Sequence, residues 1–92
     1  MSRSLGEFTA DGIVWASKAR LSSVVVITDK TNDATVILYD NASAASGTKV
    51  FEGACPGADD SRHFDFGDAV DAKNGLYLDI TGTGASCIVY MA

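Results

Sequence analysis

Residues 21–28 read LSSVVVIT, and this stretch decides the fold. Four β-branched residues follow one another from Val24 to Ile27, and such side chains favour extended strands over helices. A short apolar run without alternation is typical of a strand that is buried on both faces. We therefore predict a central strand over residues 20–28.

Alternating segments on the C-terminal side of this run predict further strands. Residues 34–40, 62–66 and 76–81 read ATVILYD, RHFDF and LYLDIT, and such alternation is typical of half-buried strands. Shorter apolar segments occupy residues 12–17, 48–52 and 86–91. Short strands separated by turns at intervals of roughly 8–12 residues favour a sandwich or barrel. The prediction is an all-β protein, a compact jelly-roll-like β-sandwich of seven to eight short antiparallel strands.

The chain of 92 residues is the size of one domain. Residues 1–11 are mixed and polar, which leaves open an arm or a first irregular strand; the expected division is an N-terminal arm over residues 1–11 and a sandwich over residues 12–92. Asn74-Gly75 predicts a hairpin, because this pair supports the positive φ angles of a type I′ turn.

Composition and charge exclude several classes of protein. The net charge is −5 and the seven Lys and Arg residues are scattered, so there is no basic patch for nucleic acid. No segment approaches the roughly 20 apolar residues of a membrane span. Residues 1–7 lack the apolar core of a signal peptide, which favours synthesis in a reducing cytoplasm. We expect neither nucleic acid nor membrane as a partner.

The residues that could perform nucleophilic catalysis are few. His63 is the only histidine, and either Cys55 or Cys87 could in principle pair with it. Nucleophilic catalysis also needs an orienting group, and no Gly-x-Ser-x-Gly elbow is present. The cysteines lie 32 residues apart without metal-site spacing, which is typical of reduced, partly buried thiols. We predict that the protein is not an enzyme.

Carboxylates gather in one stretch of the chain, which raises the alternative of a bound cation. The members are Asp59, Asp60, Asp65, Asp68 and Asp71. Ca²⁺ takes several oxygen ligands, but this spacing does not match an EF-hand loop. A solvated strand edge explains the same residues, since edge charges discourage aggregation. We expect no metal and no cofactor.

Large apolar residues near the N-terminus are candidates for an interface. Aromatic side chains anchor protein interfaces, and Phe8 and Trp15 lie close to the start of the chain. Arg3 and Leu5 belong to the same segment. The candidate interface is therefore Arg3, Leu5, Phe8 and Trp15.

Four segments resemble small virion proteins of tailed bacteriophages. They are residues 21–26 (LSSVVV), 34–43 (ATVILYDNAS), 45–51 (ASGTKVF) and 74–84 (NGLYLDITGTG), and the resemblance covers roughly residues 20–90. It implies a capsid decoration or cement protein that binds the major capsid protein. It further implies a location on the capsid surface after synthesis in the host cytoplasm, and a homo-oligomer, with a trimer favoured. No catalytic residue is carried over.

Two alternatives remain open. The same motifs do not distinguish a head protein from a tail, connector or fibre-associated module of the virion. Trp15 and the tyrosines also suit a β-sandwich that binds carbohydrate or another ligand.

Overall fold

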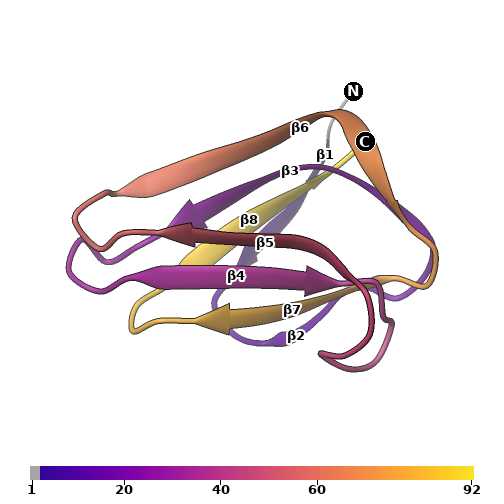
Figure 1. Cartoon of the computed structure of the whole chain (residues 1–92), viewed down its shortest axis with the longest axis horizontal. Helices are drawn as coiled ribbons and strands as arrows, with labels where there is room; N and C mark the ends of the chain where they lie inside the picture. Colours follow the sequence, from indigo (N-terminus) through magenta and orange to yellow (C-terminus); the bar gives the residue numbers. More distant parts are fainter. Residues whose placement is uncertain (1–2) are drawn as a thin grey trace.

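A computed structural model describes residues 3–92, and these residues form eight β-strands and no helix (Figure 1). The strands are β1 (Arg3–Phe8), β2 (Gly12–Trp15), β3 (Ala19–Ile27), β4 (Ala34–Tyr39), β5 (Lys49–Cys55), β6 (Ser61–Ala72), β7 (Leu76–Thr81) and β8 (Ser86–Met91). Among the described residues there is accordingly no helix that could cross a membrane.

The strands form two four-stranded antiparallel sheets that pack face to face. Sheet A has the order β1-β8-β3-β6, and sheet B has the order β2-β7-β4-β5. Except for the β4–β5 hairpin, each strand lies in the sheet opposite to the strand before it. Pairing of β1 with β8, β2 with β7, β3 with β6 and β4 with β5 is the arrangement of an eight-stranded jelly roll. The prediction of an all-β sandwich is confirmed.

The core lies between the sheets and follows from the alternation of side chains along each strand. Val24 and Val26 of β3 are fully buried, as are Val36 and Leu38 of β4 and Leu78 of β7. Val25 and Ile27 of β3 are only half-buried. The prediction that this strand is buried on both faces is therefore wrong for the isolated chain, because no element of the described residues covers the outer face of sheet A.

Three phenylalanines close the side of the sandwich where β5 and β6 form the sheet edges. The Phe51 ring meets Phe64 and Phe66 edge-on, with centroid distances of 5.1 and 5.5 Å. Such edge-to-face pairs stabilise beyond the area that they bury. The alternation predicted for residues 62–66 thus gives β6 an inner aromatic face.

Two local expectations differ from the structure. Residues 3–8 of the expected arm form β1, which pairs with β8, so they belong to the sandwich; Met1 and Ser2 lie outside the described residues. Asn74-Gly75 is not a hairpin, because β6 and β7 lie in different sheets. The turn instead carries the chain from one sheet to the other.

Candidate functional site

The predicted interface residues lie on the side of the sandwich opposite the cluster of Phe51, Phe64 and Phe66. Leu5 and Phe8 are on β1 and Trp15 is on β2, which are the edge strands of the two sheets there. All three are half-buried and pack against the core. Arg3 begins β1, and its side chain is outside the described atoms. These apolar groups therefore serve the core in part, and their role as an interface stays a prediction.

The residues considered for nucleophilic catalysis do not come together. His63 is exposed and pairs with Val25, which places it on the outer face of sheet A. Cys87 is buried on the inner face of sheet A, and Cys55 is buried in β5 of sheet B. The part of the chain that the structure describes encloses no pocket. Neither cysteine can therefore form a dyad with His63 in this fold.

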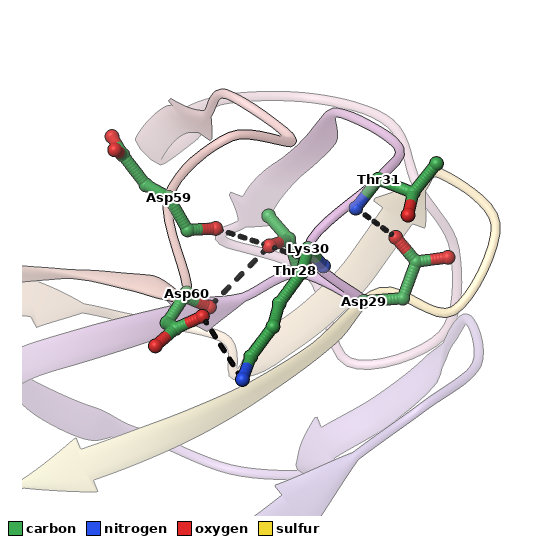
Figure 2. A network of polar contacts seen from close by, with 6 residues as sticks. All are labelled: Thr28, Asp29, Lys30, Thr31, Asp59 and Asp60. Carbon is green, nitrogen blue, oxygen red and sulfur yellow. Dashed lines mark hydrogen bonds and ion pairs between the residues drawn. The ribbon is translucent and has the colours of Figure 1, made fainter.

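The described acidic side chains of residues 59–71 are spread over several ion pairs and turns. Figure 2 shows the end of the sandwich where the Thr28 hydroxyl donates to the carbonyl of Asp59, and where Lys30 lies 3.6 Å from the Asp60 carboxylate. Asp71 instead pairs with Arg20 at 3.0 Å. The side chain of Asp68 lies outside the described atoms, and among the described side chains no group of three His, Cys, Asp or Glu residues could hold a metal ion.

Asp29 organises the turn at the same end (Figure 2). Its Oδ1 accepts the backbone N–H of Thr31 at 2.9 Å, the bond drawn in Figure 2. Oδ1 also accepts the backbone N–H of Asn32 at 2.7 Å, and Oδ2 accepts the Asn32 side-chain amide. Hydrogen bonds to Asn32, its backbone N–H first, hold the pKa of the Asp29 carboxyl below its ordinary value. Both oxygens of this carboxylate are therefore used by hydrogen bonds within the turn.

Three of the four segments that carry the resemblance, residues 34–43, 45–51 and 74–84, come together at the opposite end of the sandwich, around Asp40. The backbone N–H of Asn74 donates to Asp40 Oδ1 at 2.7 Å, and the backbone N–H of Asp40 donates to the carbonyl of Thr48 at 2.8 Å. The bond from Asn74 is the main cause that lowers the pKa of Asp40. Asp40 thus joins the loop between β4 and β5 to the distant turn before β7, and its role is structural.

Outward side chains of sheet B form a surface that we call the tyrosine face. One row crosses all four strands, because Ile13 pairs with Tyr77, Tyr77 with Tyr39 and Tyr39 with Lys49. The next row is Asp79, Ile37 and Glu52. Ile13 is 51% exposed, and no other large hydrophobic residue among the described positions is as exposed to solvent. The tyrosine face comprises these seven residues.

Outward side chains of sheet A form a second surface, the aliphatic face. Its centre is made of Val25 and Ile27 on β3 and of Ile88 and Tyr90 on β8, all half-buried and outside the core. Sequence reasoning named the tyrosines as possible ligand-binding residues but did not place them on one face, and it missed the aliphatic face. A signal for the second was present, since β8 is apolar on both of its faces.

Each of the four edge strands contains a bulge. Extra residues interrupt the register of β1 after Ser4, of β2 after Ile13, of β5 at Val50 and of β6 between Asp65 and Val70. Bulges at sheet edges oppose the pairing of another strand. Association of this protein is therefore expected through the faces or ends of the sandwich.

Comparison with protein-family models, with curated proteins and with solved structures finds no match to this chain. The two faces and the fold are thus the basis for a functional proposal.

The buried thiol of Cys87 gives a testable dependence of stability on pH. Burial, aided by the Glu7 carboxylate, raises its pKa from 9.0 to about 11. The folded state holds the thiol proton of Cys87 more tightly than the unfolded state does. The resulting contribution to the free energy of unfolding is therefore complete below about pH 9 and is lost as the pH rises towards 11. Each unit of pKa difference is worth about 1.4 kcal/mol.

We expect the wild type to lose more stability than Cys87→Ala between about pH 8 and about pH 10.5. Urea unfolding at the two pH values measures this, and the tyrosines and lysines common to both proteins cancel. Equal losses would show that the thiol ionises normally in the fold.

Proposed function

We propose that this protein is a structural protein of a tailed-phage particle, a capsid decoration protein that binds and stabilises the assembled head shell. The observation that carries the proposal is the tyrosine face, where side chains of Ile13, Tyr77 and Tyr39 align across neighbouring strands and no described element covers them. Tyrosine is enriched at binding hot spots because it joins a large apolar area to a polar end. We assign the major capsid protein as the partner of this face.

Two further points support the proposal. The resembling segments supply most of the tyrosine face, since Ile37, Tyr39, Lys49, Tyr77 and Asp79 all lie within them. Jelly rolls also occur in viral capsid proteins, although the same fold serves lectins and cupins and so does not assign a function alone.

The charges of the tyrosine face define the chemistry of the partner surface. Glu52 lies 3.4 Å from Lys49, whereas Asp79 has no ion pair with any described side chain. A half-buried carboxylate beside Tyr77 and Ile37 suits an arginine or lysine from the partner, because desolvated charges need a counter-charge. The shell surface under this protein should therefore present a cationic side chain.

We predict that the double variant Tyr39→Ala/Tyr77→Ala loses at least about tenfold in affinity for shells assembled without the protein, because truncating one hot-spot residue removes about 2 kcal/mol and 1.4 kcal/mol is tenfold. Co-sedimentation with such shells measures the affinity, and the temperature at which filled heads release DNA measures stabilisation. Thr83→Ala, exposed in the loop between β7 and β8, is the control.

Other outcomes would redirect the assignment. Wild-type protein that neither co-sediments with shells nor changes DNA release is not a decoration protein. Antibody label on the tail in electron micrographs would favour the tail or fibre alternative. Glycan binding that the double variant abolishes would favour the carbohydrate-binding alternative.

The oligomeric state stays a prediction. The resemblance implies a trimer, and trimers need contacts between two different patches of each subunit. A mass of three chains in solution would support the trimer and would contradict the two-fold pair proposed below, which predicts a mass of two chains.

A further inference from the structure

We propose that a second copy of this chain covers the aliphatic face, with the two sheets A packed face to face about a two-fold axis parallel to their strands. This contact is separate from the shell-binding surface, because the tyrosine face belongs to the other sheet. It goes beyond the proposed function and does not depend on it.

The sequence of β3 is the first reason. Its run Val24 to Ile27 has the pattern of a strand buried on both faces, yet this chain buries only Val24 and Val26 completely. Ile88 and Tyr90 of the neighbouring strand repeat the pattern, beside the buried Cys87 and Val89. Face-to-face packing with another sheet would bury the second side of both strands.

The absence of charge from the centre of this face is the second reason. From the bulge onward the outward residues of β3 are Ser23, Val25 and Ile27, and those of β8 are Ser86, Ile88 and Tyr90. The charged Arg20 lies at the other end of β3, where it pairs with Asp71 of β6. Neither strand therefore places a charged group at the centre of this face, whereas the tyrosine face has Asp79 next to Ile37. Two tyrosine faces in contact would bury carboxylates against aliphatic side chains, which is unfavourable. Self-association thus favours sheet A.

Charge complementarity identifies the second copy and orients it. One row of sheet A reads Glu7, Ile88, Val25 and His63 across β1, β8, β3 and β6. A two-fold axis along the strands exchanges β1 with β6 and β8 with β3. It therefore places Glu7 over His63 of the other copy and Ile88 over its Val25. An imidazole N–H can donate a hydrogen bond to a carboxylate, and the two-fold axis forms this contact between His63 and Glu7 twice, once at each rim of the interface.

The neighbouring row obeys the same operation. It reads Ser4, Tyr90, Ser23 and Asp65, so the axis places Tyr90 over Ser23 and the Ser4 hydroxyl over the Asp65 carboxylate. An axis perpendicular to the strands would instead set β1 over β1, and it would bring two Glu7 carboxylates together where it passes through their row. Like charges face to face are unfavourable, so the parallel axis is the one we propose.

The size of the face is sufficient for a pair of moderate affinity. A standard interface takes about 800 Å² from each partner. This is about a sixth of the 4883 Å² surface of the chain, so one face of the sandwich is large enough to supply it. The bulged edges disfavour association strand to strand, so face packing is the route left to this sheet.

The solution mass measured against concentration tests the proposal. We expect twice the chain mass for the wild type, and at least tenfold weaker association for Val25→Lys, since a lysine ammonium would then lie against the Ile88 side chain of the other copy. Ile37→Lys, the matched control on the tyrosine face, should associate like the wild type. Circular dichroism establishes that each variant is folded, and Val25→Ser is the milder replacement if the lysine variant does not fold.

A charge exchange tests the orientation. His63→Glu should weaken the pair at least tenfold, because two carboxylates then meet at each rim, and Glu7→Lys/His63→Glu should restore it to within about threefold of the wild type. A monomer at all concentrations, a mass that Val25→Lys does not change, or a double variant without recovery would overturn the proposal. A pair that does not bind shells would contradict the proposed function alone.

Discussion

Replacing Gly75 with alanine should lower the free energy of unfolding by at least about 3 kcal/mol, which is exceptional for the addition of one methyl group. Gly75 has φ of 148°, a conformation that L-residues rarely adopt and that stores about 1–3 kcal/mol of strain. A Cβ there would also lie 2.6 Å from the Trp15 carbonyl oxygen and 3.2 Å from Ala42 Cα. Both contacts are with backbone atoms, so relief requires the strand ends to separate.

Gly67→Ala is the matched control for this change. Gly67 has φ of 68°, but a Cβ there would meet nothing within 4 Å. Its replacement should lower stability by only about 1–2 kcal/mol, the ordinary penalty of a left-handed L-residue. Urea unfolding of the two variants gives the comparison. Equal losses would mean that the close approach to Trp15 and Ala42 is unimportant.

This turn also shows where sequence reasoning reaches its limit. Strand positions were predictable because alternation and glycine turns are local properties, as in the LYLDIT stretch of β7. The sheet to which a strand belongs is decided by distant partners, and β7 pairs with β2 and β4 rather than with β6. Asn74-Gly75 therefore favours a tight turn by its residue types, but in the fold this turn connects strands of two different sheets.

The same limit applies to the candidate surfaces. Val24 and Val25 are identical residues in the sequence, and only the packing of the sheets makes one core and the other surface. Phe8 and Trp15 near the N-terminus also pack against the core, which the sequence pattern did not indicate, and their role in an interface stays a prediction. Tyr39 and Tyr77 come together only through the register of β4 with β7, which no local pattern encodes.

Adjacent residues of β4 provide the second large effect and separate folding from binding. Leu38→Ala should lower the free energy of unfolding by about 2–5 kcal/mol, because Leu38 is fully buried between the sheets and its truncation leaves a cavity. A domain of this size has only about 5–15 kcal/mol in total, so the variant should unfold at markedly lower urea. Urea and thermal unfolding measure the change.

Ile37→Ala removes a similar volume one residue away, from the outer side of the same strand. Ile37 is half-buried and lies outside the core, so its truncation should lower stability by only about 1 kcal/mol or less. Its effect should appear instead in shell binding, because Ile37 lies beside Asp79 and Glu52 on the tyrosine face. Loss of stability equal to that of Leu38→Ala would mean that the chain itself uses this face for packing. Unchanged stability together with weakened co-sedimentation would separate the two sides of one strand into a folding side and a binding side.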